Sequence, residues 1–293
     1  MDRSVFFRHK AEVNDAGFRA GKFQAYTMPA HHQHNDIELN LVVSGQLEYL
    51  FGNRELVLPA GSFALFWAAM PHHITQTTPD AVHYYVHVPT TWFLSWQLAF
   101  TQAILNGSIL VTRAVEPADV AGFHQPFFDR LCSDIVSDNV QRHIVALLEV
   151  EALVRRMAVE SDLLDFSNTT HQKHGKAAQM ARFIAEHYCD SDLCVQHIAD
   201  AVGIKPNSAM KLFRRHYTTT LIDYLTRYRV AHAQNLLITT DAKIIDIAFE
   251  VGFSSSSRFY AAFKQITGTS PGAYRSALES PHVPSYLVEA ERS

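Results

Sequence analysis

The sequence predicts an α+β protein with two domains: a β-rich N-terminal domain with flanking helices, and an all-helical C-terminal domain. Short apolar runs separated by Gly and Pro fill residues 18–115 of the 293-residue chain, a pattern typical of the closely spaced strands of a compact barrel or sandwich. Between residues 176 and 275 the apolar residues recur at helical spacing instead. A chain of this length can build two separate cores.

In the N-terminal part, we expect strands at the apolar runs 39–43, 47–51, 56–58 and 63–67, because turn-forming Gly or Pro residues punctuate them. Residues 119–159 change to a helical period, with a stripe that we expect to pack on the β domain or on a second subunit; it consists of Ile144, Leu147, Leu148, Glu151 and Val154. The polar segment that follows predicts a linker. We therefore expect domains at 1–165 and 176–279, a linker at 166–175 and a tail at 280–293.

One pattern occurs twice in the helical part, 49 residues apart. Its first copy is Val195, Ile198, Ala199 and Val202 followed by Gly203, and its second copy is Ile244, Ile247, Ala248 and Val251 followed by Gly252. Each copy is one apolar helical stripe closed by a glycine suited to a left-handed turn, and a second stripe follows each glycine. Helix, glycine turn and helix form a helix-turn-helix, so the tandem copies predict a DNA-binding domain.

The solvent-facing stripes after the two glycines are the candidate DNA-reading faces. A solvated helical face is the plain alternative, but two matched copies favour DNA contact. Amide, hydroxyl and cationic groups suit base edges and phosphates, and we expect the first stripe to specify sequence and the second to anchor. The candidates are Asn207, Met210, Lys211 and Arg214 in the first copy, and Ser256, Ser257, Arg258, Tyr260, Ala261 and Lys264 in the second.

Residues 221–238 contain neither Gly nor Pro and predict one long helix between the two copies. A helix of that length spans roughly 27 Å. Such a spacer suits two recognition helices that lie about one DNA turn apart, or about 34 Å.

Charge and composition narrow the function classes. The net charge of −4 is uneven, because residues 175–279 hold twelve Lys or Arg against nine Asp or Glu. The C-terminal part is thus the polyanion-facing one. No signal peptide or membrane span is evident. Three cysteines without CxxC spacing support neither a disulfide framework nor a zinc finger, so we expect a cytoplasmic protein.

The C-terminal residues resemble the arabinose-regulator (AraC/XylS-type) family of DNA-binding proteins. The residues that carry the resemblance are Ala248, Gly252, Phe253, Ser257, Phe259, Phe263, Lys264, Gly268, Ser270, Pro271, Tyr274 and Arg275. The resemblance implies a seven-helix domain and a transcription activator that also contacts RNA polymerase. Ala261 departs from the family pattern, where a long polar side chain is frequent, so we expect the second copy to rely more on phosphates.

The N-terminal domain resembles a cupin barrel. His32, His34 and Glu38 form HxHxxxE, and a degraded second motif includes His72. Imidazole and carboxylate ligands suit Fe, Mn or Zn. Three interpretations stay open: sugar contact without metal, which the family favours; structural histidines; or a metal site on His32, His34, Glu38 and His72. The HxH spacing predicts that His32 and His34 share one side of a strand, and we add Trp67 as an aromatic sugar contact.

Further stretches resemble the branch of the family that responds to α-galactosides; they are residues 66–68, 71–72, 93–96 and 255–260. The resemblance implies a melibiose-like sugar as effector. Our hypothesis is a non-enzymatic activator of a carbohydrate operon that needs no cofactor. Its expected partners are double-stranded operator DNA, a small sugar, RNA polymerase and a second copy of the chain, with no membrane. The alternatives are a metal-dependent cupin enzyme tethered to DNA, and a regulator that senses nothing.

Overall fold

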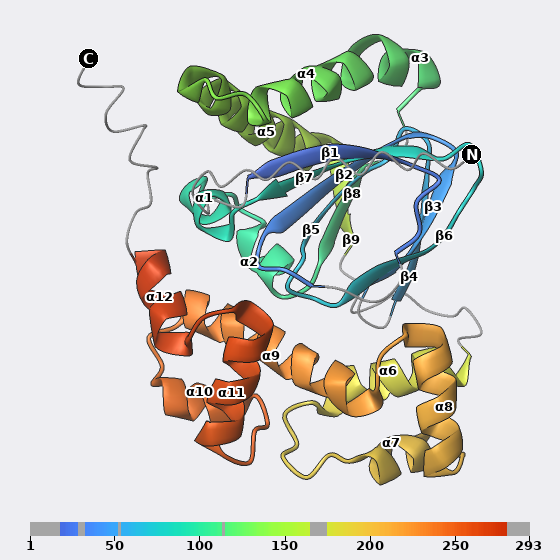
Figure 1. Cartoon of the computed structure of the whole chain (residues 1–293), viewed down its shortest axis with the longest axis vertical. Helices are drawn as coiled ribbons and strands as arrows, with labels where there is room; N and C mark the ends of the chain where they lie inside the picture. The colour runs from blue at the N-terminus through green and yellow to red at the C-terminus, as the bar shows by residue number, and fades with distance from the viewer. Residues whose placement is uncertain (1–17, 29–32, 52–53, 113–114, 165–174, 280–293) are drawn as a thin grey trace.

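The computed structural model describes residues 18–28, 33–51, 54–112, 115–164 and 175–279. It confirms the predicted fold class: a β-barrel that carries helices on one side is joined to an all-helical C-terminal part (Figure 1). The linker expected at 166–175 lies almost wholly outside the described residues, as does the tail at 280–293. No helix among the described residues is both long enough and apolar enough to cross a membrane.

The barrel consists of two antiparallel sheets within the described residues, with strand orders β1-β7-β2-β5-β8-β9 and β4-β3-β6. The four strands expected from the sequence are β2 to β5. The strands are β1 (Arg19–Gln24), β2 (Ile37–Ser44), β3 (Gln46–Phe51), β4 (Arg54–Pro59), β5 (Phe63–Trp67), β6 (His72–Thr77), β7 (Val82–Val88), β8 (Ile109–Thr112) and β9 (Ser161–Leu164).

The alternation of β2 and β7 separates a polar face from an apolar one. In the ladder between these strands Glu38 pairs with His87 and Asn40 pairs with Tyr85. Since side chains at i and i+2 share a face, these polar residues point to the barrel interior. The intervening Tyr84 points outward, where its hydroxyl donates a hydrogen bond to Asp129 of the covering helix.

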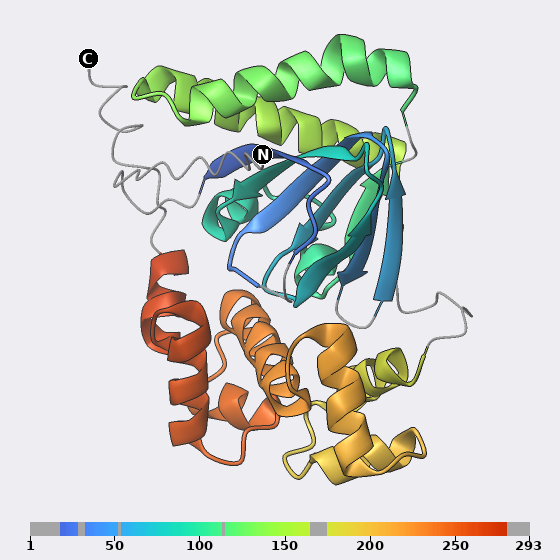
Figure 2. The same cartoon turned by 45° about the vertical axis from the view of Figure 1, so that its right-hand side comes forward.

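The two long helices of the N-terminal part, α4 and α5, lie against the outer face of the barrel on the side away from the C-terminal helices (Figure 2). After the longest of them the chain returns to the sheet as β9, a strand that the sequence did not predict. The stripe expected on this helix is also only partly right, because Val154 is buried whereas Leu148 is exposed. The helices are α1 (Thr90–Ser95), α2 (Thr101–Leu105), α3 (Pro117–Asp119), α4 (Gln125–Ile135), which a π-helical turn (Val120–His124) precedes, and α5 (Val140–Glu160).

The C-terminal part repeats a helix-turn-helix on either side of one long helix, α9. Side-chain caps mark three helix starts: Thr220 accepts a hydrogen bond from the Asp223 amide, Ser255 accepts one from the Arg258 amide, and Ser270 accepts one from the Ala273 amide. Such caps satisfy amides that a helix start leaves unpaired. The helices are α6 (Lys176–His187), α7 (Val195–Ala201), α8 (Pro206–Tyr217), α9 (Leu221–Thr239), α10 (Ile244–Glu250), α11 (Ser256–Thr267) and α12 (Pro271–Glu279).

The two turn glycines are both left-handed, as predicted, but their surroundings differ. Gly203 has φ +65° and open space where a Cβ would lie, whereas Gly252 has φ +89° and would place a Cβ 2.4 Å from the Tyr188 carbonyl oxygen. The nearby Arg229 of α9 donates hydrogen bonds of 2.7 Å to the carbonyls of Tyr188 and Asp190. The second turn is thus packed tightly against the end of α6.

Barrel and helical domain share an interface built on α9. Gln234 Nε2 donates to Asn35 Oδ1 at 2.6 Å, and Asn235 Nδ2 donates to Asn106 Oδ1 at 2.7 Å. Gln234 is fully buried. A continuous apolar cluster also extends from the barrel through α6 to α9. A buried amide must be hydrogen-bonded to avoid a desolvation penalty, so these contacts tie the barrel to the helix that joins the two helix-turn-helix units.

Candidate functional site

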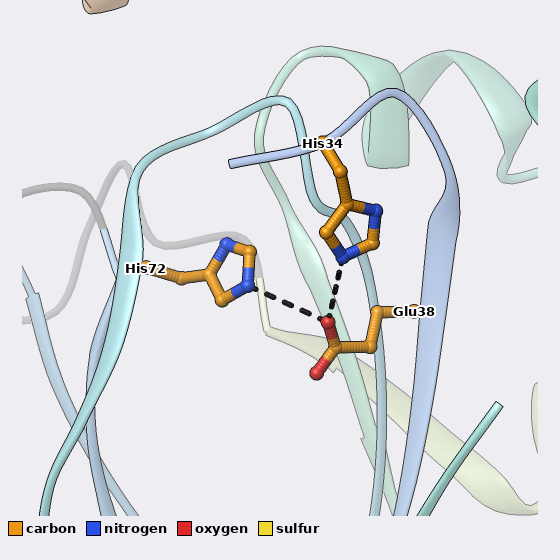
Figure 3. Close-up of side chains that lie close together, drawn as sticks. All are labelled: His34, Glu38 and His72. Atoms are coloured by element: carbon orange, nitrogen blue, oxygen red, sulfur yellow. Dashed lines mark hydrogen bonds and ion pairs between the residues drawn. The ribbon is translucent and has the colours of Figure 1, made fainter. Parts of the chain in front are cut away.

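Three histidines converge on one carboxylate inside the barrel. The Nε2 atoms of His34, His72 and His87 lie 3.1, 3.4 and 3.5 Å from the same Oε2 of Glu38. Figure 3 shows His34 and His72 approaching this oxygen from different sides. Glu38 lies on β2, His72 begins β6, and His87 lies on β7. His34 lies in the loop just before β2, so the expectation that it sits on a strand is wrong.

Further polar contacts hold this cluster in place. His34 Nδ1 is 3.3 Å from Asp36 Oδ2, and His72 Nδ1 lies 3.0 Å from the carbonyl oxygen of Met70. A carbonyl only accepts hydrogen bonds, so His72 carries a proton on Nδ1. Asn40 Nδ2 donates to the other oxygen of Glu38 at 2.9 Å. The side chains of the cluster are therefore held both by their contacts with one another and by these surrounding partners.

Burial and hydrogen bonds shift the pKa values of the carboxylate and of the histidines in different directions. Burial alone would raise the pKa of Glu38, but hydrogen bonds from His34, His72 and His87 outweigh it and hold this pKa well below its ordinary range. Burial would likewise lower the pKa of His34, yet Asp36 and Glu38 raise it to about 9. Burial lowers the pKa of His87. A fixed anion at Glu38 is the result.

A cavity of about 170 Å³ opens beside the cluster. One wall is aromatic, because the Phe23 ring stacks on Tyr26 at 4.3 Å and on Tyr85 at 5.1 Å between centroids. Such rings suit the C–H face of a sugar or another apolar surface, while the polar groups opposite suit hydroxyls. The lining residues are Phe23, Tyr26, Met28, Glu38, Asn40, Tyr49, Ile74, His83, Tyr85 and His87.

The sequence-based effector set is only partly assembled here. His34, Glu38 and His72 come together as expected, and His32 lies outside the described residues. Trp67 is buried on β5, and its Nε1 donates to the Asn35 carbonyl at 3.4 Å. Trp67 pairs with Ile37 in the ladder, one residue out of phase with Glu38. It does not line the cavity, and we assign it to the core.

Sequence reasoning missed most of the cavity wall. The available signal was the alternation of β7, where His83, Tyr85 and His87 recur at every second position and hence share a face. Asn40 follows Glu38 with the same period on β2. Phe23 and Tyr26 carried no such signal, since only the tertiary fold brings their strand to the cavity.

The predicted DNA-reading side chains lie on the outer faces of α8 and α11. Within α8 the apolar Ala209 and Phe213 are buried, while the predicted polar stripe is exposed. Within α11 the buried residues are Phe259 and Phe263. Among the ten candidates on α8 and α11, Ser256 is half-buried and the other nine are exposed. The exposed candidates are Asn207, Met210, Lys211, Arg214, Ser257, Arg258, Tyr260, Ala261 and Lys264. Which bases or phosphates they contact stays a prediction.

Comparison with known proteins agrees with both halves of this architecture. A helix-turn-helix domain profile matches residues 198–277, and a cupin domain profile matches residues 22–88. The melibiose operon regulatory protein of Escherichia coli (strain K12) is 33% identical over 264 residues, which cover 85% of this chain and 84% of that protein. The arabinose operon regulatory protein of the same strain is 26% identical over 82% of this chain and 80% of its own length.

Among solved structures, ToxT of Vibrio cholerae O395 is 14% identical, covers 91% of this chain and 100% of its own, and has a TM-score of 0.37. The similarity to the melibiose regulator is closer and spans both the barrel and the tandem helix-turn-helix. The chain therefore belongs to the AraC/XylS-type (arabinose-regulator) family of DNA-binding transcription regulators.

Proposed function

We propose that this regulator activates a carbohydrate-utilisation operon when a sugar, melibiose or a related α-galactoside, binds in the barrel. The observation that carries the proposal is the cavity beside Glu38, which lies on the same domain that contacts α9. We take residues 1–165 as the effector-binding and dimerisation domain, 166–175 as the linker and 176–279 as the DNA-binding domain. The similarity to the melibiose regulator supports the choice of sugar.

The cavity supplies the two kinds of surface that sugars require. The aromatic wall around Phe23 can cover a C–H face, and the carboxylate of Glu38 and the amide of Asn40 can bond hydroxyls. Its volume is that of about six water molecules. We therefore expect a single sugar ring, the terminal galactosyl unit, to occupy it.

A route from the cavity to the DNA-binding domain starts in the loop before β2. His34 of this loop contacts Glu38, and the next residue, Asn35, accepts the hydrogen bond from Gln234 of α9. The Asn35 carbonyl also accepts hydrogen bonds from Thr90 and Trp67. A ligand that moves His34 moves Asn35 with it. Differential affinity for two positions of this loop would shift the DNA-binding arrangement.

The N-terminal helices offer a surface for a second copy of the chain. Val145 and Leu148 are exposed on α5, three residues apart and hence on one face. Adjacent apolar side chains on one exposed helix face can pack against a helix of a second copy. We propose a homodimer through α5, bound to operator DNA and, as the family resemblance implies, in contact with RNA polymerase.

A panel of sugars tests the proposal on the full chain. The panel comprises melibiose, raffinose, galactose, arabinose and galacturonate, and the readouts are thermal unfolding and affinity for DNA selected by the protein from a random library. Melibiose or another α-galactoside is expected to raise the melting temperature with log concentration and to change the DNA affinity. DNA binding without any response to the panel would contradict the sugar assignment. Absence of sequence-specific binding at low salt would contradict the regulator itself.

A further inference from the structure

We propose that a second cavity, on the outside of the barrel, binds a small carboxylate with an apolar body, such as an aromatic or short-chain acid. The cavity has a volume of about 220 Å³ and lies between α5 and the place where β5 begins and β8 ends. We call it the α5 cavity. It is separate from the cavity beside Glu38, and its ligand is independent of the proposed sugar response.

Four apolar side chains form most of the wall of the α5 cavity. Phe63 and Met157 are buried, and Val115 and Leu153 are half-buried. A wall of this kind binds an aromatic ring or a short alkyl chain, because binding removes apolar surface from water. The volume equals that of about seven water molecules. A ligand of about seven to ten non-hydrogen atoms therefore fits.

One cation in the lining gives the cavity a preference for anions. Arg156 of α5 is exposed, lines the cavity and forms no hydrogen bond or ion pair with the residues that the structure describes. A guanidinium binds a carboxylate through two parallel N–H···O bonds. No Asp or Glu is among the described lining residues, so this position is open to the carboxylate of a ligand.

The lack of a partner distinguishes Arg156 from the neighbouring arginines. The other arginines of α4 and α5 each pair with a carboxylate of the same two helices: Arg130 with Glu149 at 2.9 Å, Arg142 with Asp134 at 3.6 Å, and Arg155 with Glu151 at 2.7 Å. A guanidinium beside an apolar wall attracts an anion more strongly than one in open water, because the local dielectric is lower.

Two further polar groups line the same cavity. Thr112 Oγ1 accepts a hydrogen bond from the Phe63 amide at 3.0 Å, and its own O–H can donate to a ligand oxygen. His124 lies edge-on to the Phe63 ring, with 5.0 Å between centroids. It ends the π-helical turn Val120–His124, and such turns are rare and occur frequently at functional sites. The polar part of the wall thus supplies donors, which a carboxylate requires.

The two cavities should select ligands of different charge. The cavity beside Glu38 presents a carboxylate to its ligand, and a second carboxylate there would meet a like charge at close range. The α5 cavity presents the guanidinium of Arg156 instead. A small carboxylate should therefore enter the α5 cavity and leave the sugar cavity free.

Isothermal titration calorimetry on the full chain tests the proposal with benzoate, hexanoate and benzamide. Benzamide has nearly the shape of benzoate but carries no charge. We expect one benzoate per chain with a Kd of about 0.1–1 mM, as its size allows, similar binding of hexanoate, and an affinity for benzamide at least about tenfold lower. No saturable binding of benzoate below about 10 mM, or equal binding of benzamide, would overturn the proposal.

Matched variants assign the binding to the α5 cavity. Arg156→Gln should lower the benzoate affinity by at least about tenfold, and Leu153→Phe should lower it by narrowing the cavity. Arg142→Gln is the control for charge, since Arg142 lies on the same helix but does not line the cavity. Phe23→Leu alters the wall of the other cavity. Both controls should leave benzoate binding unchanged.

Thermal unfolding of each variant shows whether it folds. An unchanged benzoate affinity in folded Arg156→Gln would contradict the assignment of the cation. A loss of benzoate binding in folded Phe23→Leu would place the ligand in the cavity beside Glu38 and overturn the proposal.

Discussion

Gln234 of the long helix α9 donates a 2.6 Å hydrogen bond to Asn35 of the barrel, and the residue before Asn35 is His34 of the buried cluster. A single loop therefore contacts both the candidate effector site and the helix that joins the two DNA-reading units. Gln234 also donates to the Tyr274 hydroxyl at 3.2 Å. The same amide thus connects α9 to α12 and to the barrel.

The Asn35–Gln234 contact should carry the response to the effector. Gln234→Met keeps the volume but removes both hydrogen bonds, and we expect DNA affinity to become insensitive to the sugar while the sugar-induced thermal shift persists. Leaving Asn35 without its donor should cost about 1–3 kcal/mol of stability. Tyr274→Phe is the matched control, because it removes only the bond within the helical domain. A full sugar response of Gln234→Met would exclude this route.

The two recognition helices should contribute differently to DNA binding. Lys211→Ala on α8 removes a group that can bond base edges, so it should lower the affinity for the selected sequence by about 1–3 kcal/mol and relax preference at one position. Lys264→Ala on α11 should weaken binding to all sequences alike and reduce the salt slope by about one. Fluorescence anisotropy over a series of salt concentrations and base substitutions measures both. Equal loss of specificity in the two variants would refute the division of labour.

The core of the second unit should be sensitive to truncation. Phe263 is fully buried, with its ring centroid 5.6 Å from that of Phe259 and 5.5 Å from that of Tyr274. Phe263→Ala should reduce the free energy of unfolding by about 3–5 kcal/mol. Tyr260→Ala, on the exposed face of the same helix, should change it by less than about 0.5 kcal/mol. Urea denaturation distinguishes the two, and similar losses would mean that the assigned faces are wrong.

Stability should fall in mild acid because of His232. Burial lowers the pKa of His232 to about 4, below the value of about 6.5 for an unfolded chain. The folded state therefore favours the neutral ring, and this contribution is complete above pH 6.5 and is lost as the pH falls from 6.5 to 4. The slope should approach about 1.4 kcal/mol per pH unit.

A histidine replacement isolates this effect. The His232 ring stacks on Tyr188 at 4.2 Å, and its Nε2 is buried with no hydrogen-bond partner among the described residues. His232→Phe keeps the stack and removes the titration, so urea unfolding at several pH values should show a shallower loss below pH 6.5. Burial also lowers the pKa of His83 to about 4, but His83 is present in both proteins and cancels. Identical slopes would contradict the assignment.

The apolar pair on α5 should control the oligomeric state. Val145→Asp combined with Leu148→Asp places charges on the exposed face, so a dimer should dissociate to a monomer in sedimentation velocity. Because both side chains are exposed, the thermal stability of the barrel should change little. A dimer that persists in the double variant would place the interface elsewhere.

The helical half was largely predictable because its signals are local. The stripes at 195–202 and 244–251, each closed by a glycine, correspond to α7 and α10 followed by left-handed turns. The cavity was harder to predict from the sequence. Its aromatic wall depends on which strands pair, and β1 meets β7 only in the folded sheet. Trp67 misled the prediction, since closeness in sequence to His72 gives no information about which face of β5 it occupies.

The close packing around Gly252 determines which spacing of two DNA half-sites the protein can bind. Any side chain there would collide with the Tyr188 carbonyl, and Arg229 holds the same segment, so the second reading unit cannot swing freely relative to the first. The two helix-turn-helix units are therefore held at a fixed separation. One base pair inserted between the two half-sites moves the second by about 3.4 Å and turns it by about 34°. The protein should then bind only one half-site at a time. Two helix-turn-helix units joined by a flexible segment would instead bind both half-sites of the longer target.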